Sequence, residues 1–190
     1  MRLLTAAKSA AAVTSALLLA NGTAYALSAD KPTRPGAGAG DVRIDLGAPV
    51  ITREDILVHA PLRTVWKIQT DVENRPTWQP DVDTVVKDTP GRLRPGSVFR
   101  WTTEGLDITS TVRQADHGKR LAWGGPAQGI GAVHVWTFTP TPDGVLVHTE
   151  ESWAGDPVTA DRAAPQAALD NSLHHWLGNL EREAESQAGT

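Results

Sequence analysis

Two side chains on successive segments have residue types that could form an acid–base pair. His134 lies within 131–139 and Glu151 within 145–153, two stretches that we predict to be strands of a hairpin across the turn 140–144. A carboxylate on one antiparallel strand can orient an imidazole on its neighbour and raise its basicity, as general acid–base catalysis requires. The alternative is a structural hydrogen bond in the wall of a polar cavity. The pair is therefore a candidate for catalysis, with a purely structural role left open.

Aromatic side chains alternate along the same segments. The chain has seven tryptophans against one tyrosine and two phenylalanines, and the tyrosine, Tyr25, lies in the N-terminal segment. Because alternate residues of a strand share a face, His134 groups with Trp136 and Phe138, and Glu151 groups with Trp153. Most buried tryptophans simply pack in a core. A set this large would also suit stacking against a flat, conjugated or polycyclic ligand.

Other reactive combinations are absent or poorly spaced. The chain has no cysteine, which excludes disulfides, thiolate catalysis and cysteine-based zinc sites. His174 and His175 are consecutive on a predicted helix, where their side chains diverge by about 100°, so we do not expect them to chelate a metal together. No P-loop or dinucleotide-binding motif is present. We expect neither a metal nor a nucleotide cofactor.

The N-terminus has the pattern of a secretory signal peptide. Arg2 and Lys8 precede or flank a short apolar run, and Ala24-Tyr25-Ala26 is a small-x-small cleavage site. The alternative is a membrane anchor, but the run falls short of the roughly 20 residues that span a bilayer. We therefore predict a signal peptide over 1–26, a flexible Ala-, Gly- and Pro-rich linker over 27–41 and one domain over 42–188. This organisation predicts a secreted or extracytoplasmic protein without stable membrane insertion after cleavage.

The charge balance argues against nucleic acid as a partner. The whole chain has a formal net charge of −4, and its 18 Lys and Arg residues are scattered rather than clustered. Binding to a phosphate backbone requires clustered positive charge. We expect a small-molecule partner instead, and the sequence leaves the oligomeric state undetermined.

The elements that must position these residues follow from periodicity and turn residues. Short alternating runs separated by turn signals predict an antiparallel meander, with strands near 49–59, 82–87, 97–103, 106–115, 121–123, 131–139 and 145–153; we expect Gly124-Gly-Pro126 to interrupt the fifth. Pro61 opens a short helix, and a second turn of helix ends at Trp78. The chain closes with a long helix over 164–186, whose apolar face is Leu169, Leu173, Trp176, Leu177 and Leu180.

The stretch Ala60–Pro80, with strands on both sides, resembles the START-like superfamily, also called SRPBCC or Bet v 1-like. The patterns His134-x-aromatic-x-aromatic and Glu151-x-aromatic-x-Gly are similar to those of its polyketide cyclase/dehydrase-like branch. This resemblance implies an α+β helix-grip fold: a seven-stranded antiparallel sheet wrapped around the C-terminal helix, with two short helices after the first strand. It also implies a ligand cavity between sheet and helix that opens near the short helices.

On this basis we place a set of side chains facing the cavity. Besides His134 and Glu151, the candidate ligand-binding residues are Trp78 at the mouth, Phe99, Trp101, Ser110, Trp123, Trp136, Phe138, Trp153 and His174. A slip of one residue in the register would reverse these assignments.

The resemblance leaves three functions open. The first is a cyclase or dehydratase that folds a hydrophobic or aromatic biosynthetic intermediate against indole walls and moves protons with His134 and Glu151. The family's aromatase members often use an arginine, tyrosine or histidine in the pocket, and this chain would lack tyrosine after removal of Tyr25. The second is a non-catalytic carrier or sensor of a lipid-like ligand, which the export signal favours. The third is an interaction module with a closed cavity.

Overall fold

The computed structural model describes residues 40–189, and these form one compact unit. The predicted signal peptide, and the predicted linker up to residue 39, lie outside the described residues. The described elements are β1 (Val50–Val58), α1 (Leu62–Thr70), the 3₁₀ helix η1 (Val72–Thr77), β2 (Val82–Lys87), β3 (Val98–Thr103), β4 (Leu106–Asp116), β5 (Arg120–Ala127), β6 (Ile130–Thr141), β7 (Gly144–Ala154), α2 (Asp156–Ala160) and α3 (Ala163–Ala188). The sequence predicted all of these except α2, a short helix that carries the chain from β7 to α3.

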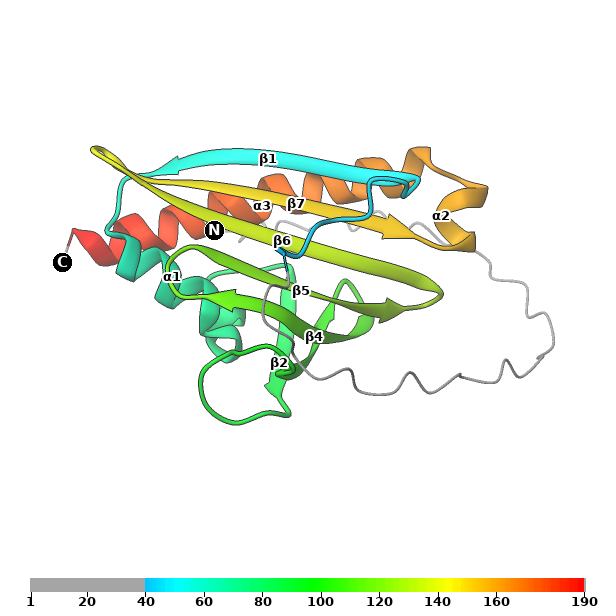
Figure 1. Ribbon diagram of the computed structural model, residues 1–190, viewed down its shortest axis with the longest axis horizontal. Coiled ribbons are helices and arrows are strands. Elements are labelled where there is room, and N and C mark those ends of the chain that lie inside the picture. Colours follow the sequence, from blue (N-terminus) through cyan, green and yellow to red (C-terminus); the bar gives the residue numbers. More distant parts are fainter. Residues whose placement is uncertain (1–39, 190) are drawn as a thin grey trace, which may run out of the picture. The chain divides into compact units, whose positions relative to one another are not determined.

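The seven strands form a single antiparallel sheet in the order β1-β7-β6-β5-β4-β3-β2, and α3 lies along one face of it (Figure 1). Short turns connect β3 through β7 as a meander, and a longer loop, 88–97, connects β2 to β3. The helical segment α1–η1 separates β1 from β2, and β1 pairs with β7 at the other edge of the sheet. A register shift between Val112 and Gln114 interrupts the pairing of β4 with β5. Such irregularities bend a sheet and increase its twist. The predicted helix-grip fold is confirmed.

Helix α3 is held to the sheet by the apolar stripe that the sequence predicted. Its members are all at most 3% exposed: Leu169, Leu173, Trp176, Leu177 and Leu180. The first two pack with Val50 and Val158 in one cluster, and the last three join the main core with α1 and the central strands. Burial of this stripe on the concave face is what allows a 26-residue helix to lie across the sheet.

Strand β5 differs from its prediction because it runs without a break through Gly124, Gly125 and Pro126. A Cβ on Gly124 would lie 2.2 Å from the Ala132 carbonyl oxygen, and one on Gly125 would lie 2.0 Å from that of Thr109. The two glycines therefore permit close approach of the neighbouring strands, which no larger residue would allow. From the sequence we predicted that this pair of glycines interrupts the strand. In the structure the pair keeps the sheet continuous.

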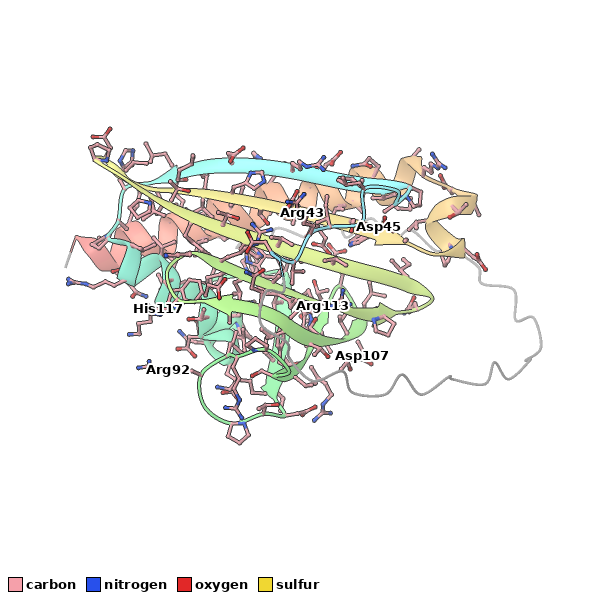
Figure 2. The ribbon with its side chains drawn as sticks, in the orientation of Figure 1. Arg43, Asp45, Arg92, Asp107, Arg113 and His117 are labelled. Atoms are coloured by element: carbon pink, nitrogen blue, oxygen red, sulfur yellow. The ribbon has the colours of Figure 1, made fainter. Side chains whose placement is uncertain are left out.

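The segment before β1 packs on the face of the sheet opposite α3 (Figures 1 and 2). Ile44 is 5% exposed and contacts Ala122 and Val135 from that side. The backbone is fastened at Val42, whose N–H donates to Gln114 Oε1 at 2.9 Å and whose carbonyl accepts from Arg120. Asp41, which the sequence assigned to the linker, accepts a hydrogen bond from Gln114 as well. None of the helices within residues 40–189 is long and apolar enough to cross a membrane.

Candidate functional site

A cavity of about 640 Å³ lies between the concave face of the sheet and the first half of α3. Four indoles line it, those of Trp101, Trp123, Trp153 and Trp176. Its rim is formed by exposed residues of the β3–β4 and β5–β6 turns, such as Glu104 and Gln128, together with Ser172 and His175 of α3. The mouth is therefore at this end of the sheet, and not beside the short helices as the resemblance implied.

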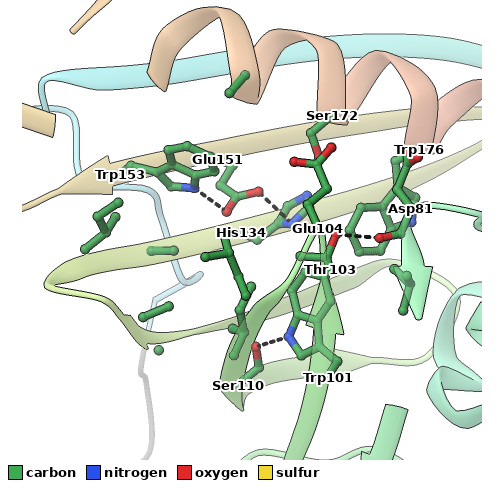
Figure 3. A pocket seen from close by; sticks show the side chains of 18 of the residues that line it. Asp81, Trp101, Thr103, Glu104, Ser110, His134, Glu151, Trp153, Ser172 and Trp176 are labelled. Atoms are coloured by element: carbon green, nitrogen blue, oxygen red, sulfur yellow. Dashed lines mark hydrogen bonds and ion pairs between the residues drawn. The ribbon is translucent and has the colours of Figure 1, made fainter. Parts of the chain in front are cut away.

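His134 and Glu151 face each other across β6 and β7 in direct register and both line this cavity (Figure 3). Nδ1 of His134 lies 2.9 Å from Oε2 of Glu151, and the Trp153 indole N–H donates to Oε1 of Glu151 at 2.7 Å. The other imidazole nitrogen, Nε2, lies 2.8 Å from the Thr149 hydroxyl. Every nitrogen and oxygen of the pair thus has a protein partner.

The environment of Glu151 keeps its carboxylate ionised. Burial favours the neutral acid, but the attraction of His134 and the hydrogen bonds from His134 and Trp153 together outweigh burial, so the pKa of Glu151 is lowered. Because Glu151 is ionised at neutral pH, the shared proton resides on His134 Nδ1. Each carboxylate oxygen has a second lone pair, so Glu151 can still accept a hydrogen bond from a molecule in the cavity.

Two further contacts fix the opposite wall. The Trp101 indole N–H donates to Oγ of Ser110 at 3.0 Å, which holds the ring on the cavity surface (Figure 3). The Thr103 hydroxyl donates to the Asp81 carbonyl at 2.6 Å and ties β3 to the segment after η1. At the rim, His175 Nδ1 is 3.7 Å from the Asp81 carboxylate. In residues 40–189, no three His, Asp or Glu side chains group closely enough to hold a metal ion.

The structure divides the residues predicted for the site into two sets. The cavity brings together His134, Glu151, Trp101, Ser110, Trp123 and Trp153. Four others, Trp78, Phe99, Trp136 and Phe138, are at most 7% exposed and pack in the main core outside the lining. His174 is 79% exposed and faces Glu54 of β1, whereas its neighbour His175 is the one at the rim. Strand parity selected the correct face of the sheet, but it does not say how far along that face the cavity extends.

The sequence missed one residue of unusual character, Arg75 of η1. Its side chain is completely buried, and none of its three guanidinium nitrogens has a hydrogen-bond partner. The guanidinium carbon lies 4.9 Å from the ring centroid of Trp176, 5.3 Å from that of Trp123 and 5.5 Å from that of Phe99. Burial lowers the pKa of Arg75 to about 9, which leaves it charged at neutral pH.

The cavity residues contributed by α3 and the loops were also missed. Trp176 was assigned only to the apolar face of the helix, and Asp81, Glu104 and Gln79 gave no signal. Their positions depend on how the loops close around the cavity, which no periodicity encodes. Arg75 gave no signal either, because an isolated arginine between Asn74 and Pro76 is ordinarily a surface residue.

An antiparallel sheet gripping a helix around an indole-lined cavity defines a class of START-like ligand-binding folds. Residues 49–185 match the family described as polyketide cyclase/dehydrase and lipid transport. The chain belongs to this family, and the predicted superfamily is confirmed. No curated protein matches the chain.

Solved structures share the fold at low sequence identity. A hypothetical protein from Helicobacter pylori is 20% identical, with a TM-score of 0.65 over 78% of this chain and 99% of that one. The Zhui aromatase/cyclase from Streptomyces sp. R1128 is 18% identical, with a TM-score of 0.62 over 71% of this chain and 93% of that one. A START superfamily protein from Mycobacterium smegmatis is 18% identical, with a TM-score of 0.61 over 72% and 98%.

Proposed function

We propose that the protein is exported and binds a flat hydrophobic or aromatic small molecule in the indole-lined cavity, as a carrier or sensor. The observation that carries the proposal is the cavity of about 640 Å³, in which four indoles and the ionised carboxylate of Glu151 line the wall. Its volume and its predominantly apolar wall surface are typical of small-molecule sites. The rings would supply stacking area, and Glu151 would accept a hydrogen bond from a ligand hydroxyl or amine.

The hydrogen bonds around His134 favour binding over chemistry. A general base must reach the proton that it removes. Here Nδ1 of His134 is occupied by Glu151 and Nε2 by Thr149, and the pair forms a closed network in the wall. This arrangement suits a fixed polar anchor for a ligand.

A cyclase or dehydratase is the second candidate, and the family and the similarity to the Zhui aromatase/cyclase support it. In that role the indole walls would fold a reactive intermediate, and His134 and Glu151 would transfer protons after a substrate group displaced Thr149 or Trp153. The hydrogen bond to Thr149 or to Trp153 would have to break in each turnover. Positioning of reacting atoms would supply much of the rate acceleration.

Native mass spectrometry of the protein purified from its producing host tests the binding function directly. We expect a retained small molecule, or, for an emptied protein, quenching of tryptophan fluorescence by a neutral planar probe with a hydroxyl donor, 2-(hydroxymethyl)anthraquinone. Glu151→Gln should weaken the binding of this probe, with Glu150→Gln on the opposite face of β7 as the control. Absence of both a retained molecule and any quenching by planar probes would contradict the proposal.

Turnover of the retained molecule separates the two candidates. If the protein is an enzyme, the molecule should be converted in single-turnover experiments, and His134→Gln should slow conversion more than it weakens binding, since a general base acts in the transition state. A molecule that is released unchanged supports the carrier. The export part is tested by N-terminal sequencing of secreted protein, which should begin at Leu27.

A further inference from the structure

Arg75 is a charged group that neither the binding proposal nor the fold accounts for. It is completely buried and makes no ion pair or side-chain hydrogen bond. A buried charge without a partner costs several kcal/mol, so proteins seldom keep one unless it acts on something. Contact with three aromatic rings offsets part of this cost through cation–π attraction, but a ring supplies no hydrogen-bond acceptor.

Arg75 lies behind the closed end of the cavity, which is the end formed by Trp123 and Trp176 and lies away from the mouth. Two of the rings that it contacts, Trp123 and Trp176, line the cavity, while Arg75 itself does not. Gln79, four residues further along the chain, is also in the lining. The positive charge is therefore separated from a molecule in the cavity by the thickness of an indole.

The core that contains these rings also holds hydrogen-bond donors without acceptors. The indole N–H groups of Trp176, Trp136 and Trp78 are buried without acceptors, and all three rings belong to the main core cluster. Trp176 is the one that lines the cavity, and because its N–H is buried it presents its ring to the cavity. Among the residues that the structure describes, no carboxylate pairs with Arg75, so the fitting partner for its charge is an electron-rich oxygen.

The charges at the other end of the cavity have the opposite sign. Asp81 and Glu104 lie toward the mouth and Glu151 lies in the wall, and none of the lining residues is Lys or Arg. His134 is bound to Glu151, and His175 faces Asp81, so these two carboxylates are partly compensated. A ligand with an acidic end would be repelled at the rim and attracted at the closed end.

We propose, on the basis of the proposed ligand-binding function, that the closed end of the cavity is a subsite for an anionic oxygen. A carboxylate, enolate or phenolate of an aromatic ligand would lie against Trp123 and Trp176 and interact with the Arg75 charge across these rings. Two opposite charges separated by a ring attract more strongly here than in water, because Arg75 is completely buried and Trp123 and Trp176 are at most 3% exposed. The ligand would enter with its acidic end first and keep its neutral or donor end at the mouth.

The test compares two matched planar probes, anthraquinone-2-carboxylate and anthraquinone-2-carboxamide, by titration calorimetry at pH 7. They have the same ring system and nearly the same shape but differ by one charge. For the parent protein we expect the carboxylate to bind about tenfold more tightly than the amide, a difference of about 1.4 kcal/mol. Equal binding of the two, or preference for the amide, would overturn the subsite and leave the binding function standing.

Variants of Arg75 assign the preference to this residue. Arg75→Met is expected to lower the ratio of the two affinities from about ten to about one, and Arg75→Lys, which keeps the charge, should retain most of it. Arg100→Met, which removes one charge from the exposed face of β3, is the matched control and should leave the ratio unchanged. A ratio that survives in a folded Arg75→Met protein would contradict the role of Arg75. If neither probe binds the parent, the proposed function fails and the subsite fails with it.

Discussion

Two buried polar groups beside the cavity are built in opposite ways. In the wall, His134, Glu151 and Trp153 form a network in which each polar atom has a partner. At the closed end, Arg75 has none and is surrounded by rings. The wall network is therefore self-sufficient, whereas the closed end is a charged group whose interactions are incomplete.

The wall network is expected to stabilise the fold, whereas the unpaired charge of Arg75 is expected to destabilise it. A fully bonded network in a low-dielectric wall holds its members in one geometry. An unpaired buried charge has the opposite effect on stability, and natural proteins retain such costs mostly at functional sites. Removal of the charge should therefore lower the free energy of unfolding for Glu151 and raise it for Arg75.

The largest effect is expected when the wall network is broken. Glu151→Ala leaves His134 Nδ1 and the Trp153 indole N–H without acceptors, so the free energy of unfolding should fall by about 3–5 kcal/mol. Urea denaturation at pH 7 measures this. The control is Glu150→Ala, whose side chain points to the other face and pairs with the half-exposed Arg53, a contact worth about 0–1 kcal/mol. Similar losses in the two variants would mean that the network contributes little.

Removal of the unpaired charge should have the opposite sign. In the Arg75→Met variant an uncharged side chain of similar volume replaces the buried arginine. We therefore expect the free energy of unfolding to rise, on the order of 1–4 kcal/mol. Thermal unfolding against Arg100→Met as the surface control measures this. A clear loss of stability would show that cation–π contacts with Phe99, Trp123 and Trp176 more than compensate for burial.

A smaller effect is expected in the pH dependence of the stability that Glu151 contributes. The pKa of Glu151 is lowered in the folded state, so the unfolded chain binds its proton more readily as the pH falls. The stability due to ionised Glu151 is therefore fully present above about pH 4.5 and is lost as the pH falls through the lowered pKa. The difference in unfolding free energy between the parent and Glu151→Gln should be constant from pH 7 to about 5 and shrink below that. A constant difference down to pH 3 would contradict this assignment.

Sequence patterns predicted the pairing of His134 with Glu151 in the wall but not the closed end of the cavity, for a physical reason. Register and face follow from a two-residue period and from turn residues, which are local, so the pairing of His134 with Glu151 and the whole sheet could be predicted. The apolar face of α3 follows equally from helical spacing. These local rules account for the fold and for the six predicted residues that do line the cavity.

The remaining lining depends on tertiary packing. Trp136 stacks against Trp123 and lies outside the lining, although strand parity places both residues on the same face of the sheet. The burial of Arg75 depends on three rings from β3, β5 and α3, residues far apart in the chain. A single sequence contains no local mark of either arrangement.

The smallest expected effect distinguishes the indoles that line the cavity from those behind it. Trp101→Phe keeps a ring on the wall but removes stacking area and the hydrogen bond to Ser110, so binding of 2-(hydroxymethyl)anthraquinone should weaken roughly fivefold, about 1 kcal/mol. Trp136→Phe is the matched control, because Trp136 is fully buried outside the lining and its N–H has no acceptor to lose. It should change the affinity less than twofold while lowering stability through the space that it leaves. Fluorescence titration of both folded variants measures the affinities. An equal loss in the two would mean that the ligand contacts Trp136 as well, and that the closed end opens when the cavity is occupied.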